Sequence, residues 1–353
     1  MMRPRSILAI SLVLIAIGLG FRASSLLIFA LSPAHQGDTS TTTLLVKRGI
    51  LPSSLSKDLQ EAGAITDSLK FYRLGVFLRK WEKLKAGEYE LSPGMTPLEV
   101  FDRLSSGISV AHRLTFPEGS NMFQVGDALE KSALTTQSEF VFLCRDKELI
   151  QKLGFKDPLP PSLEGYLYPE TYHFNRTMST EDMIRTMVKG FNGTWTPAYT
   201  AKAKKAGMTR HEIITLASIV EKETGVPEER PRISSVFHNR LKKGMRIESD
   251  PTTIYGIWET FDGNLRKKHL SEKNSYNTYR LRGLPIGPIA NPGREAILAA
   301  LEPEESPYFY FVSRNDGTHV FSKTFEDHKR AVKNFQVNQA ARKGKSWRDR
   351  LNK

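Results

Sequence analysis

The sequence predicts an α+β protein with an N-terminal transmembrane helix, a small domain and a larger α+β domain. A long apolar run opens the chain, a strand-helix-helix-strand pattern follows at residues 44–112, and helical and strand patterns alternate from residue 113 to residue 340. The hydrophobic share of 39% and the charged share of 25% are ordinary for a folded chain, and 353 residues leave room for two or three domains.

The first residues predict a membrane anchor. Residues 1–5 carry two arginines, and the mostly apolar residues 6–31 are long enough for a spanning helix of about 20 residues. Basic residues before the span keep the N-terminus in the cytoplasm and place the rest of the chain outside. A cleaved signal peptide is the alternative, but no clean small-x-small cleavage site is present. The polar residues 32–43 form a tether.

Residues 44–112 predict a compact unit with two strands and several helices. Thr96 and Glu99 have the spacing of a capping box, with Pro97 at the first helical position and Gly107 as the end of the helix. The elements expected before this helix are a strand at 46–50, helices at 53–65 and 68–81, and a returning strand at 87–93.

The net charge of +13 predicts an anionic partner: nucleic acid, anionic lipid or an acidic polymer. The sequence shows no helix-turn-helix, zinc-finger or aromatic-basic RNA-binding pattern, and its basic residues are scattered, so we expect no nucleic-acid partner. The basic tail at 341–353 is interpreted as a solvated charge run, or alternatively as a contact to anionic lipid. The single cysteine, Cys144, excludes an internal disulfide and a cysteine-based metal site.

One helix is predicted to be buried around most of its circumference. Thr209 and Glu212 have capping-box spacing, so the helix should begin at Arg210, and Gly225 and Pro227 end it. Nearly every residue between these signals is apolar, too evenly spread for a helix on the surface.

Glu221 stands near the end of this helix, stacked over Ile214 and Ala217 on an apolar face. Burial and the negative end of the helix dipole both disfavour a carboxylate, so we expect a raised pKa. A carboxyl that is still protonated near neutral pH can act as a general acid. The alternative is an ion pair with Arg240, Arg246 or another cation that only anchors the helix.

The C-terminal part predicts a β-hairpin followed by a last helix. Alternating apolar strands flank an Asn-Asp-Gly turn at residues 308–321. Thr324 and Asp327 have the spacing of a helix start, and Asn291 is expected to cap a helix begun by Pro292.

Four stretches resemble the endolytic murein transglycosylases, the YceG-like family. They are ASIVEKETGVPEERPRISSVFHNRLKKGMRIESDPTTIYG (217–256), EGYLYPETYHF (164–174), SYNTYRLRGLPIGPIANPGREAILAAL (275–301) and YFYFVSRNDGTHVFSKTFEDH (308–328). The resemblance runs from residue 44 to residue 336, in the family's order. Members of the family cut the glycan strands of peptidoglycan at the bacterial inner membrane.

The resemblance implies a LysM-like domain at 44–112 and a YceG-like catalytic domain at 113–340, with Glu221 as the catalytic glutamate. LysM modules in general bind glycan; the alternative is a spacer that lifts the enzyme off the membrane. In EGYLYPETYHF the resemblance suggests Glu164, Tyr168 and Glu170 as residues of a glycan cleft. The alternative is a half-buried strand and loop whose tyrosine hydroxyls are satisfied internally.

Asn239 and Arg240 resemble the family's Asn-Arg pair, which would orient Glu221 or bind an N-acetyl group. The alternative is a helix C-terminus where an arginine suits the dipole. The other expected substrate contacts are Asp250, Tyr255, Asn277, Thr278 and Tyr279.

The family mechanism implied for this chain uses one carboxyl as both acid and base. Glu221 would cleave the bond between N-acetylmuramic acid and N-acetylglucosamine and leave a 1,6-anhydro end, which would terminate nascent strands beside penicillin-binding synthases. We infer no cofactor, because no metal-ligating cluster is evident. Two alternatives stay open: a hydrolase in which Asp250 or Glu170 positions water, and a membrane-anchored wall-binding scaffold without catalysis.

Overall fold

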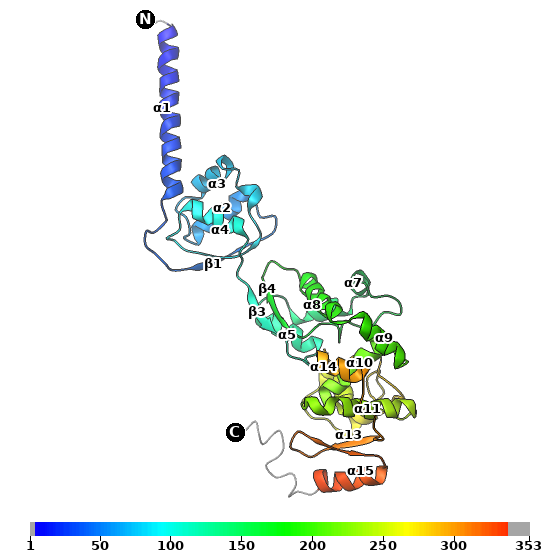
Figure 1. The fold of residues 1–353 in the computed structure, drawn as a ribbon. Coiled ribbons are helices and arrows are strands. Elements are labelled where there is room, and N and C mark those ends of the chain that lie inside the picture. The colour runs from blue at the N-terminus through cyan, green and yellow to red at the C-terminus, as the bar shows by residue number, and fades with distance from the viewer. Residues whose placement is uncertain (1–3, 338–353) are drawn as a thin grey trace. The chain divides into compact units, whose positions relative to one another are not determined.

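The computed structural model describes residues 4–337 of the chain (Figure 1). These residues form two compact units, each with helices and short strands. Within the described residues, the first unit runs as far as Arg113 and includes His173–Ser179, and the second comprises Leu114–Tyr172 and the chain from Thr180 onward. The predicted α+β class is therefore confirmed.

Helix α1 (Pro4–Leu31) occupies the position of the predicted anchor. Across the part of the chain that the structure describes, no helix qualifies as long and apolar enough to span a membrane. The side chains of residues 4–13, 15, 16 and 19 fall outside that part, as do residues 1–3 and the predicted basic tail at 341–353. The anchor and its orientation therefore stay predictions.

The first unit has the expected order of elements. β1 (Thr42–Val46) pairs antiparallel with β2 (Gly87–Leu91), so that Thr42 lies opposite Leu91 and Val46 opposite Gly87. Its helices are α2 (Pro52–Glu61), α3 (Ser68–Phe77), the short 3-10 helix η1 (Trp81–Lys83) and α4 (Pro97–Ser106). The capping box of Thr96 and Glu99 is present, and Gly107 ends α4 with a φ of 73°, so both predictions are confirmed.

The predicted strand at 46–50 was placed too late in the chain, because residues 47–50 form a turn. The Ile50 amide donates to the Lys47 carbonyl at 3.3 Å, and Gly49 has a φ of 73°, a conformation that glycine adopts without strain. The strand therefore ends at Val46.

The core of the first unit is aromatic and aliphatic. Phe71 and Phe101 stack with their ring centroids 4.1 Å apart, and Trp81 packs edge-on against both. Phe29 and Ala30, from the last turn of α1, are buried in the same cluster. The end of α1 is thus part of the domain core.

The second unit is mainly helical. Thr115 and Phe116 meet Glu170 and Thr171 in the small sheet of β3 (His112–Thr115) and β4 (Thr171–Phe174). The helices before the predicted catalytic helix are α5 (Met122–Lys131), α6 (Gln137–Arg145), α7 (Lys147–Lys152), α8 (Thr180–Thr194) and α9 (Pro197–Lys205).

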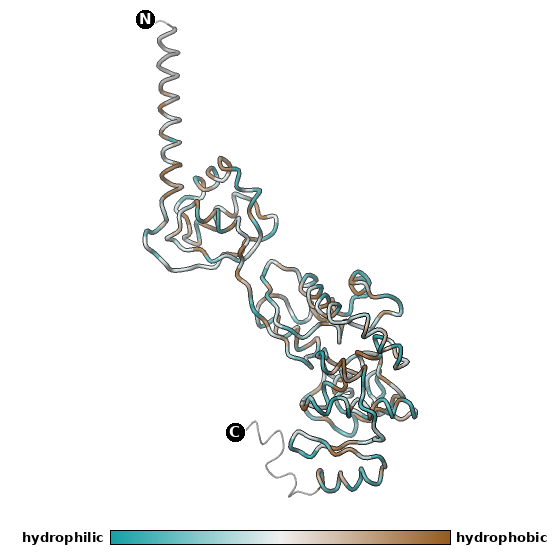
Figure 2. The backbone as a smooth tube through the Cα atoms, viewed as in Figure 1, coloured by the Kyte–Doolittle hydropathy of each residue, from teal (hydrophilic) through white to brown (hydrophobic). Residues whose placement is uncertain are grey.

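The centre of the second unit is the predicted buried helix, α10 (Arg210–Glu223). It packs against α11 (Arg230–Lys242) and α14 (Arg294–Leu301), and these two helices also contact each other. Residues 213–220 are all buried. Figure 2 colours the backbone by hydropathy and shows hydrophobic stretches in the region of α10 and α14. The shorter elements around them are η2 (Pro227–Glu229), α12 (Asp250–Gly256), η3 (Trp258–Thr260) and α13 (Lys267–Ser271).

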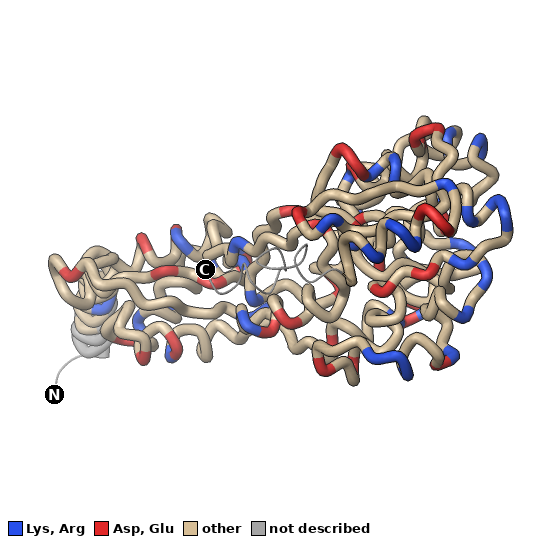
Figure 3. Tube along the Cα trace, turned by 90° about the horizontal axis from the view of Figure 1, so that it is seen from below, with Lys and Arg blue, Asp and Glu red and all other residues tan. Residues whose placement is uncertain are grey.

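The C-terminal hairpin and helix are confirmed. β5 (Tyr310–Ser313) pairs antiparallel with β6 (His319–Ser322), and Asn315 and Gly317 in the turn have positive φ. α15 (Phe325–Val332) is capped by Thr324, whose side chain accepts from the Asp327 amide, and a short π-helix, η4 (Lys333–Val337), follows. Lysines and arginines are spread over both units with acidic residues among them (Figure 3).

Candidate active site

The helix that carries Glu221 is capped at its N-terminal end. The Thr209 hydroxyl accepts from the Glu212 amide at 3.2 Å, and the Glu212 carboxylate accepts from the Thr209 amide at 2.8 Å. This is the predicted capping box, which satisfies two amides that have no partner within the helix. Because the middle of α10 is buried, its last turn holds Glu221 at a defined place.

The Glu221 carboxylate is buried and bound at both oxygens. Its side chain is 6% exposed. Oε1 accepts from an Arg230 Nη2 donor at 3.0 Å, and Oε2 accepts from the Gly293 amide at 3.0 Å. Both contacts suit a carboxylate, and a proton on either oxygen would weaken the contact that this oxygen accepts. The ion pair is made by Arg230, a cation that the sequence analysis did not name, and not by Arg240 or Arg246.

Gly293 brings a second acid to the same place. A Cβ on Gly293 would lie 1.8 Å from Glu118 Oε1, so the Glu118 carboxylate rests against this glycine and no larger residue fits without displacing it. Glu118 Oε2 also lies 3.9 Å from Arg230 Nη2. Glu118 and Glu221 therefore flank Gly293 and share one guanidinium.

The two acids differ in their surroundings. The Glu118 side chain is 47% exposed, whereas that of Glu221 is nearly buried. Partial burial raises the pKa of Glu118, the charge of Glu221 raises it further, and Arg230 opposes both effects. The sequence analysis does not identify Glu118, because this residue stands in a Pro-Glu-Gly segment without the spacing of a catalytic motif.

The turn that carries Glu118 is tied to the helices around it. The Gly119 carbonyl accepts from Lys222 Nζ at 3.1 Å, and the Gly119 amide donates to the Asn291 carbonyl at 2.9 Å. Gly119 has a φ of 76°, which few other residues adopt. The position of Glu118 thus follows from the turn that precedes α5.

Asn291 does not cap a helix, contrary to the prediction. Its Oδ1 accepts from the Gly165 and Leu167 amides at 2.9 and 3.0 Å, and its Nδ2 donates to the Ser120 carbonyl at 2.9 Å. The side chain is turned into the interior, where Nδ2 also donates to Glu164 Oε1 at 3.1 Å, so that Asn291 binds four groups. α14 starts at Arg294, with Gly293 at the N-cap and no side-chain cap.

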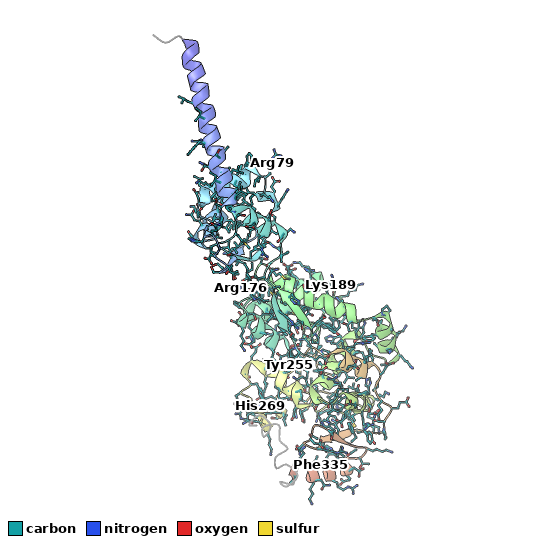
Figure 4. The ribbon with its side chains drawn as sticks, turned by 60° about the vertical axis from the view of Figure 1, so that its left-hand side comes forward. Arg79, Arg176, Lys189, Tyr255, His269 and Phe335 are labelled. Atoms are coloured by element: carbon teal, nitrogen blue, oxygen red, sulfur yellow. The ribbon has the colours of Figure 1, made fainter. Side chains whose placement is uncertain are left out.

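Glu164 lies in the interior. Its side chain is completely buried, accepts from the Met122 amide at 2.9 Å and from Asn291 Nδ2 at 3.1 Å, and bonds to the Tyr255 side chain. Burial raises the pKa of Glu164 to about 7 and holds that of the Tyr255 hydroxyl well above its usual value. Glu164 and Tyr255 thus form an internal pair (Tyr255 is labelled in Figure 4), whereas the sequence suggested an open cleft wall.

The backbone carbonyls of Tyr168 and Glu170 accept hydrogen bonds that stabilise the same motif. The Tyr168 carbonyl accepts from the Tyr172 hydroxyl at 2.7 Å, and the Glu170 carbonyl accepts from the Phe116 amide at 3.0 Å. The Tyr168 side chain is half-buried, and that of Glu170 faces solvent.

Asn239 and Arg240 bind backbone groups and do not contact Glu221. Asn239 Nδ2 donates to the Ser306 and Tyr308 carbonyls, each at 2.9 Å. Arg240 Nε donates to the Phe309 carbonyl at 2.7 Å, and Nη1 donates to the Ile247 carbonyl at 2.6 Å. Both residues join the end of α11 to neighbouring segments, which agrees with the helix-terminus alternative for Arg240.

A second polar cluster lies beyond the end of α10. The Tyr279 hydroxyl donates to the exposed Asp250 carboxylate at 2.7 Å. Asn277 and Thr278 are completely buried; Asn277 accepts from the Thr253 hydroxyl at 3.1 Å, and Thr278 shares a bond of 2.8 Å with Thr252.

Glu223 joins this cluster through Ser249, whose hydroxyl donates to it. Burial raises the pKa of Glu223 to about 7. Glu221 and Glu223 thus bind different neighbours, Arg230 and Gly293 in one direction and Ser249 in the other. Of the predicted substrate contacts, Asp250 and Glu170 are exposed, and Tyr168, Asn239 and Tyr279 are half-buried.

An aromatic hollow of about 380 Å³ lies near the Glu164–Tyr255 pair. Phe123 and Trp258 stack in its wall with centroids 6.1 Å apart, and Arg145 lies over the Phe123 ring and pairs with Glu259 at 3.0 Å. Among residues 4–337, no group of three or more His, Cys, Asp or Glu is placed to hold a metal ion.

Residues 44–334 match the YceG-like family. The chain belongs to this family. It is 31% identical over 318 residues to the endolytic murein transglycosylase of Bacillus subtilis, an alignment that covers 86% of this chain and 88% of the relative. A relative of the same name in Streptococcus pneumoniae is 27% identical, with 86% of this chain and 60% of the relative covered.

A solved YceG-like structure supports the fold. The crystal structure of a YceG-like protein from Listeria monocytogenes is similar to this chain with a TM-score of 0.56 and 33% identity. The similarity covers 83% of this chain and 99% of the Listeria chain.

Proposed function

We propose that this protein is an endolytic murein transglycosylase, a lyase that cuts the glycan strands of peptidoglycan. The observation that carries the proposal is the environment of Glu221, the residue that matches the family's catalytic glutamate. Its carboxylate is nearly buried at a helix end and is held by Arg230 and the Gly293 amide. The names of the curated relatives support the same activity.

In the proposed reaction, protonated Glu221 donates its proton to the glycosidic oxygen between N-acetylmuramic acid and N-acetylglucosamine, and the bond from C1 to that oxygen breaks. The carboxylate then takes the proton of the muramyl C6 hydroxyl, whose oxygen closes onto C1. The product carries a 1,6-anhydro end, and no water is consumed. One carboxyl suffices because departure of the leaving group regenerates the base, whereas most glycosidases need two.

The neighbours of Glu221 fit the carboxylate stage of this cycle. A guanidinium donor and the N-terminal end of α14 both stabilise a negative charge at this place. Before the acid step, Arg230 must release Oε1. Glu118, which lies 3.9 Å from the same Nη2, offers Arg230 a second partner when it does so.

The charge of the chain and its aromatic hollow fit a glycan substrate with acidic peptides. The net charge of +13 favours an anionic polymer. The half-buried ring of Trp258 lines the hollow, and Arg145 and Glu259 offer polar groups beside it. The proposal further includes the single-pass anchor in the bacterial inner membrane, an extracytoplasmic catalytic domain, a LysM-like first unit and work beside penicillin-binding synthases on nascent strands.

The products of a peptidoglycan digest test the reaction type. We expect new muramyl ends that are lighter than reducing ends by one water, together with fragments from the middle of strands. Reducing ends would overturn the lyase proposal and favour a hydrolase in which Asp250 or Glu170 positions water. Glycan binding without cleavage would favour a wall-binding scaffold.

A further inference from the structure

Helix α3 of the first unit presents an apolar face to solvent. Leu69, Tyr72 and Val76 are 54%, 38% and 53% exposed, and Phe77 at the end of the helix is 76% exposed. The first three follow one another at helical spacing, so they lie on one face. Phe71 and Leu74 are on the opposite face, in the core. Contiguous apolar surface of this kind marks an interaction site.

Basic residues are frequent in α3 and in the segment that follows it. Residues 68–85 contain one acid, Glu82, and six basic residues, namely Lys70, Arg73, Arg79, Lys80, Lys83 and Lys85. Lys80 pairs with Asp102 at 2.7 Å, whereas the side chains of Arg73, Arg79 and Lys83 lie at exposed positions. A helix with an apolar face and a basic border fits the surface of a membrane that contains anionic lipid.

The place of α3 in the first unit favours the same partner. The last turn of α1 is built into the core through Phe29 and Ala30, and α1 contacts both α3 and α4. α3 therefore lies at the end of the unit from which α1 extends, and the sheet of β1 and β2 lies at the opposite end (Figure 1). Arg79, which follows α3, lies near α1 (Figure 4). Leu27, Ile28 and Leu31 of α1 are also exposed.

We propose that α3 and the turn after it, residues 68–83, dock on the surface of the membrane that α1 enters. Leu69, Val76 and Phe77 enter the boundary between headgroups and acyl chains, while Arg73 and Arg79 bind lipid phosphates. This inference rests on the proposed membrane anchor. Docking fixes the orientation of the first unit on the membrane, which an anchor alone would leave free to rotate.

The test uses the full chain in vesicles of phosphatidylcholine with or without phosphatidylglycerol. Phe77→Cys is labelled with a polarity-sensitive fluorophore, and Glu90→Cys, at an exposed position of β2 in the same unit, is the matched control. The native Cys144 is completely buried, so it does not compete for the label. Phe77 is exposed, so its replacement leaves the core intact.

We expect the label at position 77 to shift to the blue in anionic vesicles and to be quenched by brominated lipids, with no change at position 90. The shift should be lost in neutral vesicles and after Arg73→Glu with Arg79→Glu. Flotation with the vesicles without a shift at position 77 would overturn docking and leave the anchor standing. A chain that does not float would contradict both, and an equal shift in neutral vesicles would overturn the role of anionic headgroups.

Discussion

The ion pair of Glu221 and Arg230 predicts a coupling that can be measured without any substrate. Both side chains are nearly buried, at 6% and 11% exposure, and are 3.0 Å apart. Removal of one partner of a buried pair costs about 3–5 kcal/mol. Glu221 would keep its bond to the Gly293 amide in Arg230→Met, so we expect a smaller loss of about 2 kcal/mol, typical of a charge-assisted hydrogen bond.

Hydrogen exchange of the α10 amides measures this loss locally, which avoids the assumption that two units unfold in one step. A loss of about 2 kcal/mol corresponds to roughly thirtyfold faster exchange. Arg232→Met is the matched control, because Arg232 is on the same helix and pairs with Glu304 at the surface. A surface pair contributes about 1 kcal/mol or less, so α10 should exchange almost as in the parent protein.

The double variant Arg230→Met with Glu221→Gln completes the cycle. We expect its loss to fall short of the sum of the two single losses by about 1–2 kcal/mol, since the second change removes a group that has already lost its partner. Strictly additive losses would show that the two side chains do not interact, and the geometry of the site would be refuted.

Three further predictions concern the groups around this pair. Glu118→Gln should slow the release of anhydro ends, because Arg230 would then serve Glu221 alone; the rate and its pH profile are measured against the parent protein, and an unchanged profile would exclude this role. Gly293→Ala should also slow the release of anhydro ends, because the added Cβ would lie 1.8 Å from Glu118 Oε1 and displace that carboxylate, while the backbone amide that binds Glu221 is kept. Activity at the parent level would contradict the close contact between Gly293 and Glu118. Stability should fall as pH rises from 4.5 to about 7, the window between the ordinary and the folded pKa of Glu164, because the folded state keeps a proton that the unfolded chain has released. Denaturation at several pH values should show this loss in the free energy of unfolding. The part that comes from Glu164 is about 3 kcal/mol at most. In Glu164→Gln the loss of stability with pH should be smaller but not zero, because Glu223 also has a raised pKa. An equal dependence of stability on pH in both proteins would contradict the burial of Glu164.

The sequence predicts an element correctly where residues close together in the chain determine its structure. Capping boxes at Thr96 and Thr209 placed two helices correctly, because each box uses groups only three residues apart. The hairpin turn at Asn315 and Gly317 was also found from local residues. The burial of Glu221 followed from the apolar circumference of α10.

The groups around Glu221 could not be predicted in this way, because they come from other elements of the fold. Arg230 is close to Glu221 in sequence but stands on a different helix, and Gly293 and Glu118 lie 72 and 103 residues away. A glutamate in a Pro-Glu-Gly turn has no local mark that distinguishes it from other surface acids. Asn291 shows the same limit, since its local pattern suggested a cap while distant backbone groups took its side chain.

The central claim is that Glu221 is the acid and base of a glycan-cleaving lyase. The most direct test is mass spectrometry of the muropeptides that the full chain releases from purified peptidoglycan, run beside Glu221→Gln and Glu228→Gln. Glu228 is exposed in the turn that follows α10, so its variant controls for the loss of one negative charge. We expect anhydro-muramyl ends from the parent protein and from Glu228→Gln, and none from Glu221→Gln. Anhydro ends released by Glu221→Gln at the parent rate would contradict the central claim.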